Sequence, residues 1–363
     1  MRIRNLISQG ICQVNGAVRR AGDRIDHGDI VAVDAFEYIP SAMTPQDIPI
    51  EVVFEDSDLM VVVKPAGMLV HPTSGVKVGT LANALTYHLN KTIFESASGE
   101  NGTSTGLDSS SAAVIPATVT MVRPGIVHRL DKATSGLMII AKTPHALSVL
   151  ARHFRRGLVK KRYLAVVRGL FSENYGMIEA PIGRDPDRRP HWWVSQSGKH
   201  AETRWKVVSR GEDKSLAELE PVTGRTNQLR IHAAYIGHPI LGDPLYGESA
   251  AVIQCAGVME GSHIGDYQSE ASSPGRLLLH AWRLAFHHPE TGVWKEFVSG
   301  PGPEMAAYLE ANGMADWTVS IASIRLADPL AVLDTDSGSQ IRHARHPGNH
   351  ILDLGQAERL GND

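Results

Sequence analysis

One acid stands alone in a strongly basic stretch of the chain. From Met121 to Tyr163 there are ten Lys or Arg residues and a single carboxylate, Asp131. The surrounding cations favour the ionised carboxylate, so we expect a lowered pKa and a charged side chain at neutral pH. Such a group is a poor proton donor but a competent nucleophile or electrostatic partner. On charge pattern alone, Asp131 could also merely cap its loop or pair with a neighbouring arginine.

The residues next to this acid predict how it is held. Asp131 lies in a polar segment, and the apolar run from Leu137 to Ala141 follows it directly. A short apolar run bounded by Gly136 and Thr143 is typical of a buried strand. We therefore expect Asp131 on a loop that leads into a strand of the core.

The amino-acid sequence of this segment resembles a known motif. The residues from His128 to Leu137 are His-Arg-Leu-Asp-Lys-Ala-Thr-Ser-Gly-Leu. They closely resemble the catalytic motif of the RluA-type pseudouridine synthases, in which the aspartate is the essential residue. Three more blocks resemble the same family in the same order, within roughly residues 50–300. They are Lys64-Pro65 in a Lys-Pro-x-Gly turn, Lys161-Arg162-Tyr163, and Gly224 to His232.

The resemblance implies roles for particular residues of this chain. Asp131 would be the catalytic carboxylate, Arg230 would pair with it, and Tyr163 would stack on the target base near its C5 proton. Arg129 would enter the space left by the flipped nucleotide. One departure is Asn227, where the family usually has His, and we expect little consequence from it. Arg230 could instead be an ordinary ion-pair residue and Tyr163 an ordinary core aromatic.

The reaction that this family performs suits these residue types. Conversion of uridine to pseudouridine breaks the C1′–N1 bond and forms a C1′–C5 bond. The base must first be flipped from its stack, at a cost of about a few kcal/mol. An ionised carboxylate can add to C1′ or assist departure of uracil by elimination, and the sequence leaves both routes open. Stacking on Tyr163 would contribute roughly 1–3 kcal/mol. No cofactor and no metal is expected.

The charge distribution favours RNA as the partner. The formal net charge is −3, but residues 121–163 sum to +9 and residues 184–210 hold seven basic and three acidic side chains. Binding to phosphates follows local potential rather than net charge. Arg155 and Arg156 fall outside the apolar stripe of a helix, so they could be solvated or face RNA. The predicted RNA-binding residues are Arg129, Lys64, Arg155, Arg156, Lys161, Arg162 and Arg225.

Composition predicts a globular protein with no membrane segment. The 363 residues are 42% hydrophobic and 21% charged, which is ordinary for a soluble domain. No apolar run approaches the ~20 residues that span a bilayer. The N-terminus lacks the apolar core of a signal peptide. Only Cys12 and Cys255 occur, which argues against a disulfide framework or a zinc site. We expect a cytoplasmic protein that acts as a monomer.

Three regions are expected along the chain. Residues 1–40 resemble the second half of the small RNA-binding module named after ribosomal small-subunit protein four, with most of its helices missing. Residues 41–312 would form the catalytic domain, with insertions at 93–120 and 250–275 that lack periodicity. Residues 313–363 are polar and are predicted to be a disordered tail. The start codon could be annotated too far downstream, or the module could be truncated.

The pattern of elements predicts an α+β fold. Short strands in hairpins alternate with short helices, without regular βαβ repeats or a glycine-rich phosphate loop, which favours a largely antiparallel sheet. Thr80 and Thr143-Pro144 are placed to begin helices. The resemblance implies the pseudouridine synthase fold, a mixed, mostly antiparallel sheet flanked by short helices.

Alternative functions differ in what they require. The leading hypothesis is an RNA pseudouridine synthase, an isomerase acting on ribosomal RNA of the large subunit; a synthase acting on transfer RNA is the alternative substrate. A catalytically silent RNA-binding protein on the same fold is a second possibility, against which intact Asp131, Tyr163 and Arg230 weigh. A hydrolase using Asp131 on a glycosidic bond would require a paired second carboxylate, and residues 121–163 offer none.

Overall fold

The chain forms two compact units, Met1–Ser41 and Ala42–Asp363. The structure is a computed structural model that describes residues 12–20, 22–33, 44–99, 121–185, 191–247, 274–314 and 340–343. The small unit contains a three-stranded antiparallel sheet in the order β2-β1-β3. Its strands are β1 (Cys12–Val14), β2 (Ala17–Val18) and β3 (Val31–Val33). That this unit is an RNA-binding module stays a prediction.

The Asn15-Gly16 turn sets the hairpin of the small unit. Asn15 and Gly16 both have positive φ, at 51° and 78°. A two-residue turn with both φ values positive matches the twist of antiparallel strands, and Asn-Gly adopts it at little cost. The Asn15 side chain also bonds Asp29, which ties this turn to the approach to β3.

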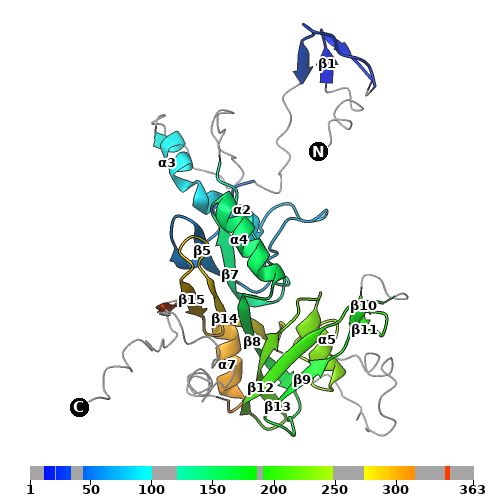
Figure 1. Cartoon of the computed structure of the whole chain (residues 1–363), viewed down its shortest axis with the longest axis vertical. Helices are drawn as coiled ribbons and strands as arrows, with labels where there is room; N and C mark the ends of the chain where they lie inside the picture. Colours follow the sequence, from blue (N-terminus) through cyan, green and yellow to red (C-terminus); the bar gives the residue numbers. More distant parts are fainter. Residues whose placement is uncertain are drawn as a thin grey trace, which may run out of the picture. The chain divides into compact units, whose positions relative to one another are not determined.

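The large unit is built on a single long sheet of 11 strands (Figure 1). Eight strands follow one another in the order β4-β5-β7-β14-β8-β13-β12-β9, and β6, β15 and β16 pair at its side. Among the described strands, only β7 with β14 and β15 with β16 run parallel. The predicted mixed, mostly antiparallel sheet is therefore confirmed. The strands are β4 (Glu51–Glu55), β5 (Leu59–Lys64), β6 (Gly125–Ile126), β7 (Ser135–Ala141), β8 (Lys160–Arg168), β9 (Tyr175–Glu179), β12 (Glu202–Arg210), β13 (Lys214–Pro221), β14 (Leu279–His287), β15 (Trp294–Val298) and β16 (Gln340–His343). A separate hairpin joins β10 (Ile182–Arg184) and β11 (Trp192–Val194).

Short helices cover both faces of this sheet. The described helices are α2 (Leu81–Leu89), α3 (Lys91–Gly99), α4 (Pro144–Arg155), α5 (Gln228–Tyr235) and α7 (Pro303–Ala311). Alternate residues of β5 and β7 pack against α4 in one core cluster and against α2 in another. Likewise, β8 packs against α5 on one face and α7 on the other. Because both faces are covered, β7 is buried at every position, which explains its continuous apolar run.

The two helix starts predicted from sequence have the expected caps. Thr80 forms a capping box with Asn83 at the start of α2. Thr143 accepts the backbone N–H of Ala146 at the start of α4, with Pro144 in the first turn. Each cap satisfies a backbone donor that lacks a partner within the helix.

Two segments expected to lack structure are ordered in part. The insertion predicted at 93–120 stays a prediction, but its first residues have regular structure, because α3 continues to Gly99. Phe94 anchors this helix by stacking on Tyr87, with ring centroids 5.2 Å apart. The predicted tail is wrong at Met314, which is buried in the cluster beneath α7, and at β16. Residues 100–120, 248–273, 315–339 and 344–363 lie outside the described residues.

No helix in the described part of the chain combines the length and apolar character needed to cross a membrane.

Candidate active site

Gly136 fixes the path of the loop that carries Asp131. It is the second residue of β7 and has φ of 119°, and it pairs with Lys64 of β5 on one side and Ala281 of β14 on the other. A Cβ atom here would collide with the backbone of Ala281. Only glycine allows the strands to approach so closely at this φ. Gly136 therefore places the Asp131 loop where β5, β7 and β14 meet.

Two imidazoles, His128 and the buried His280, bond to the strand that follows this loop. His128 Nε2 accepts the backbone N–H of Ile139 at 2.9 Å, and its ring stacks on Phe154. His280 contacts Ser135 Oγ at 2.9 Å and the carbonyl of Ser299 at 3.1 Å. Burial lowers the pKa of His128 to about 3 and that of His280 to about 4, so both rings are neutral at pH 7. These histidines join strands rather than act on a ligand.

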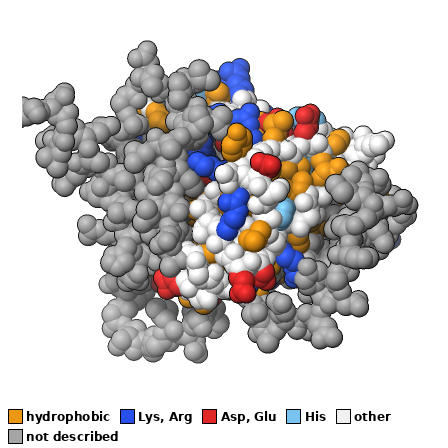
Figure 2. Space-filling model, turned by 90° about the horizontal axis from the view of Figure 1, so that it is seen from below, with side chains coloured by type: hydrophobic (Ala, Val, Ile, Leu, Met, Phe, Trp, Pro, Cys, Tyr) orange, Lys and Arg blue, Asp and Glu red, His pale blue; other side chains and the backbone are white. Residues whose placement is uncertain are grey.

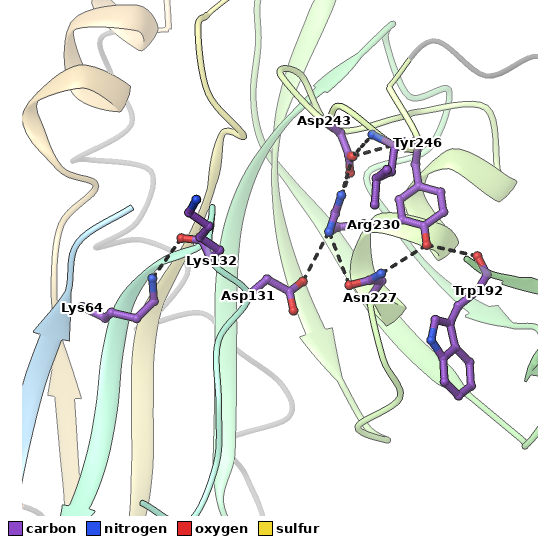
Figure 3. A network of polar contacts seen from close by, with 9 residues as sticks. Lys64, Asp131, Lys132, Trp192, Asn227, Arg230, Asp243 and Tyr246 are labelled. Atoms are coloured by element: carbon purple, nitrogen blue, oxygen red, sulfur yellow. Dashed lines mark hydrogen bonds and ion pairs between the residues drawn. The ribbon is translucent and has the colours of Figure 1, made fainter. Parts of the chain in front are cut away.

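Arg230 lies between two carboxylates (Figure 3). It projects from α5, and its side chain is 8% exposed. Its Nη1 atom is 3.6 Å from Asp131 Oδ2, while Nε and Nη2 bond the two oxygens of Asp243 at 2.7 and 2.6 Å. Burial acts to lower the pKa of Arg230, but Asp243 and Asp131 outweigh it and raise the pKa. The structure thus places Arg230 next to Asp131, as predicted from the sequence. Its shorter bonds, however, go to Asp243, which the sequence analysis did not identify.

Asp243 is the site residue that the sequence analysis did not identify. Its side chain is fully buried. Besides the guanidinium, its Oδ1 accepts the backbone N–H groups of Leu245 and Tyr246 at 2.9 and 3.1 Å. The available signal was a carboxylate inside the turn-rich run Gly242 to Gly247. That pattern predicts a turn, but nothing in it names Arg230 as the partner.

Asn227 extends the network to the β10–β11 hairpin. It adopts the left-handed conformation, with φ of 54°, directly before α5. Its Oδ1 accepts from Arg230 Nη1 at 3.3 Å, and its Nδ2 donates to the Tyr246 hydroxyl at 3.2 Å. That hydroxyl donates to the carbonyl of Trp192 at 3.1 Å. Asparagine tolerates this backbone conformation better than most residues, so the departure from the family's usual His is compatible with the turn.

Tyr163 lies on β8, on the same side of the sheet as α5 and α2. It pairs with Leu219 of β13 and Ala281 of β14, so it follows Gly136 across the sheet. Its half-buried ring contacts the clusters beneath both helices. Burial, together with the negative charge of Asp131, raises the pKa of the Tyr163 hydroxyl well above its usual range. The hydroxyl therefore stays protonated, near the carboxylate.

Lys64 is buried, contrary to the predicted RNA contact. The residue is 0% exposed, and its Nζ donates to the carbonyls of Pro65, Met68 and Lys132 at 2.8, 2.9 and 3.2 Å. Gly67 N–H bonds the same Lys132 carbonyl. Burial lowers the pKa of Lys64 to about 8, partly offset by Asp131. Lys64 therefore ties its own turn to the Asp131 loop instead of facing solvent.

The other predicted RNA-binding residues divide by exposure. Arg162 is buried, with Glu218 at 3.3 Å and Glu220 at 3.7 Å, so its predicted RNA contact is wrong as well. Lys161 is half-buried over the ring of Phe154. Arg225 is half-buried and donates through Nε to the carbonyl of His200. The exposed predicted residues are Arg129, Arg155 and Arg156. On the face seen in Figure 2, Lys and Arg side chains stand among acidic and hydrophobic ones.

Comparison with known proteins gives consistent matches. The family model described as RNA pseudouridylate synthase matches residues 58–235. An uncharacterized RNA pseudouridine synthase of Aquifex aeolicus is 37% identical over 298 residues, covering 81% of this chain and 83% of that protein. Ribosomal large subunit pseudouridine synthase D of Zymomonas mobilis is 39% identical over 300 residues, covering 82% and 84%. The structure of human RNA pseudouridylate synthase domain containing 4 is similar in fold, with a TM-score of 0.50 and 21% identity over 72% of this chain and 92% of that one.

Proposed function

The chain belongs to the RNA pseudouridylate synthase family, whose members are isomerases acting on RNA, and from that premise we propose that it converts specific uridines of large-subunit ribosomal RNA to pseudouridine through the carboxylate of Asp131. The observation that carries the proposal is the placement of this carboxylate. Its side chain is 32% exposed, with the guanidinium of Arg230 at 3.6 Å and the neutral phenol of Tyr163 nearby. The exposure lets a substrate reach the carboxylate, and a guanidinium partner can hold a carboxylate in a defined orientation.

Each group has a defined task in the proposed reaction. The target nucleotide leaves its stack, and the exposed Arg129 beside Asp131 enters the vacated space. The C1′–N1 bond breaks, the uracil turns against the ring of Tyr163, and C1′ bonds to C5. The hydrogen on C5 is released to solvent, and N1 gains a proton. Addition of the carboxylate to C1′ and elimination assisted by it both remain compatible with this geometry.

Asp243 argues against glycosidic hydrolysis as the alternative chemistry. A hydrolase of this type pairs its acid with a second carboxylate that meets water or the leaving group. Asp243 is the second carboxylate of the network, but it is fully buried and occupied by Arg230 and two backbone N–H groups. It has no exposed oxygen to offer, so isomerisation without loss of uracil is the better match.

Two features support the choice of RNA. Relatives such as the Zymomonas mobilis protein are named as pseudouridine synthases of the ribosomal large subunit and cover most of this chain. The exposed Arg129, Arg155 and Arg156 lie on the Asp131 loop and at the end of α4. Affinity should therefore fall steeply with salt, since these cations displace counterions from the backbone. Large-subunit RNA is the proposed substrate; transfer RNA is the competing one.

Tritium release tests the proposed chemistry and substrate together. The purified chain is incubated with ribosomal or transfer RNA that carries tritium at C5 of uracil, and released tritium, pseudouridine and free uracil are measured. We expect tritium release matched by pseudouridine, with ribosomal RNA preferred and no free uracil. Release of uracil would instead identify a hydrolase. Preferred turnover of transfer RNA would contradict the substrate, and RNA binding without tritium release would contradict the enzyme.

A further inference from the structure

The guanidinium of Arg230 is shared unequally between two acids on different segments. Two of its nitrogens bond Asp243 in a bidentate pair at 2.7 and 2.6 Å. Only Nη1 faces Asp131, at 3.6 Å, and it also donates to Asn227 at 3.3 Å. A bidentate arginine–carboxylate pair fixes the plane of the guanidinium as well as its position. Asp243, not Asp131, therefore sets where Nη1 points.

Asp243 can do this because its own position is fixed. Its Oδ1 accepts two backbone N–H groups from the turn that follows. The preceding Gly242 has φ of 71° and lies so close to the carbonyl of Arg276 that any Cβ would collide with it. The loop is thus pinned next to the segment that enters β14, and β14 pairs with the start of β7. The position of Asp243 is therefore fixed relative to β14, and that of Asp131 relative to β7, which pairs with β14.

We propose that Asp243 is a positioning residue for the isomerisation. It holds Arg230 so that one N–H-bearing nitrogen stays near Asp131 without forming a close ion pair with it. This inference rests on the proposed function of Asp131 and Arg230 and adds a residue to it. Without Asp243, the buried guanidinium has one acid fewer to bond, so it moves either onto Asp131 or away from it. Either displacement alters the carboxylate that reacts.

A second aspartate of the chain provides a matched control. Asp56 follows β4, and its Oδ1 also accepts two backbone N–H groups, from Asp58 and Leu59, at 2.9 Å each. Its Oδ2 contacts His288 at 2.9 Å, and His288 is 4% exposed. This arrangement repeats that of Asp243 but stands before β5, whose other end holds Lys64 and meets Gly136. Asp56→Asn therefore removes the charge from a comparable turn and pair away from Asp131.

The experiment compares Asp243→Asn with Asp56→Asn in the full chain. Asparagine keeps an oxygen for the two backbone N–H groups but places no charge against Arg230. We measure the single-turnover rate constant of pseudouridine formation at saturating RNA, the RNA dissociation constant and the melting temperature. Misplacing a reacting group by about 1 Å costs on the order of 10²-fold in rate. We expect that loss for Asp243→Asn, with unchanged RNA affinity, and a wild-type rate constant for Asp56→Asn.

A double-mutant cycle distinguishes positioning from mere support of the fold. If Asp243 acts through Arg230, adding Asp243→Asn to Arg230→Gln should slow the reaction no further, because residues that act as a unit are not additive. Independent, multiplying losses would overturn the proposal, as would a wild-type rate constant for Asp243→Asn. Should that variant fail to fold, Asp243→Glu replaces it, since the longer side chain keeps the charge but shifts the guanidinium that it holds. A slow Asp243→Glu with unchanged RNA affinity supports the proposal, and a wild-type rate constant overturns it.

The inference and the proposed function fail differently. If Asp131→Asn is inactive and Arg230→Gln is slow while Asp243→Asn is normal, the proposed function stands and the role of Asp243 is refuted. If Asp131→Asn isomerises uridine like the wild type, the proposed function is refuted, and the role of Asp243 with it.

Discussion

Two buried cations approach Asp131 from different sides, and they are satisfied in opposite ways. Lys64, at the end of β5, donates to three backbone carbonyls. Arg230, on α5, bonds the side-chain carboxylate of Asp243 and faces that of Asp131. Burial lowers the pKa of Lys64 to about 8, whereas the two acids raise that of Arg230. Lys64 therefore holds the backbone of the Asp131 loop, whereas Arg230 interacts with the charge of the Asp131 carboxylate.

The contrast follows from the chemistry of the two side chains. A lysine ammonium has three donors that can spread over carbonyls from separate residues, and its proton can be lost. A guanidinium is planar, forks onto carboxylates and keeps its charge at any pH that a protein survives. We therefore expect Lys64 to govern stability and Arg230 to govern the reaction. The predictions below test that division, beginning with the largest effect.

Arg230→Gln should slow isomerisation by roughly 10²–10³-fold at saturating RNA, the usual cost of losing one preorganised group at a reacting centre. The RNA dissociation constant should change little, because Arg230 is buried. Single-turnover kinetics and filter binding measure the two quantities. Lys64→Met serves as the comparison, and its folded fraction should react faster than Arg230→Gln. Equal rates for the two variants would contradict the claim that Lys64 governs stability and Arg230 governs the reaction.

Lys64 should make stability rise with pH in a particular window. Its pKa in the folded chain, about 8, lies below the ordinary 10.5, so between these values the unfolded chain binds more protons. Wild-type stability should therefore increase from pH 8 to pH 10, by about 2 kcal/mol relative to Lys64→Met. Denaturant unfolding at both pH values measures this difference. Identical pH slopes for the two proteins would show that Lys64 does not bury a charge.

Tyr163→Phe tests whether the Tyr163 side chain acts through its ring or through its hydroxyl. The ring should stack on the uracil. Tyr163→Phe is therefore expected to keep most of the ordering of the base, while Tyr163→Ala loses about 1–3 kcal/mol of stacking free energy. Rates of tritium release and pseudouridine formation for both variants measure this. If Phe is as slow as Ala, the hydroxyl is essential, and charge alone does not account for the site.

Asn227→His should have the smallest effect. The substitution removes the bond to Arg230 Nη1 at 3.3 Å, but the bidentate pair with Asp243 remains. Loss of one such hydrogen bond amounts to about 0.5–1.5 kcal/mol, or at most about tenfold in rate. A larger loss would show that Asn227, rather than Asp243, controls the guanidinium.

The sequence predicted the elements better than the contacts of the site. Thr80 and Thr143 marked helix starts because caps are local, and β7 was recognisable because burial on both faces makes it apolar from Leu137 to Ala141. Whether Lys64 faces RNA or the interior depends on a carbonyl of Lys132, 68 residues away. The partner of Arg230 likewise depends on how the 242–247 loop packs against the entry to β14. Such pairings are decided by tertiary packing, which no local pattern encodes.

The most direct test of the account is Asp131→Asn, because that substitution keeps the shape of the side chain and removes the charge that every proposed role requires. The full-length variant is compared with the wild type in single-turnover reactions on C5-tritiated ribosomal RNA, with RNA binding and melting temperature measured on the same samples. The account predicts a folded protein that binds RNA and releases no tritium. Tritium release and pseudouridine formation near the wild-type rate would contradict it.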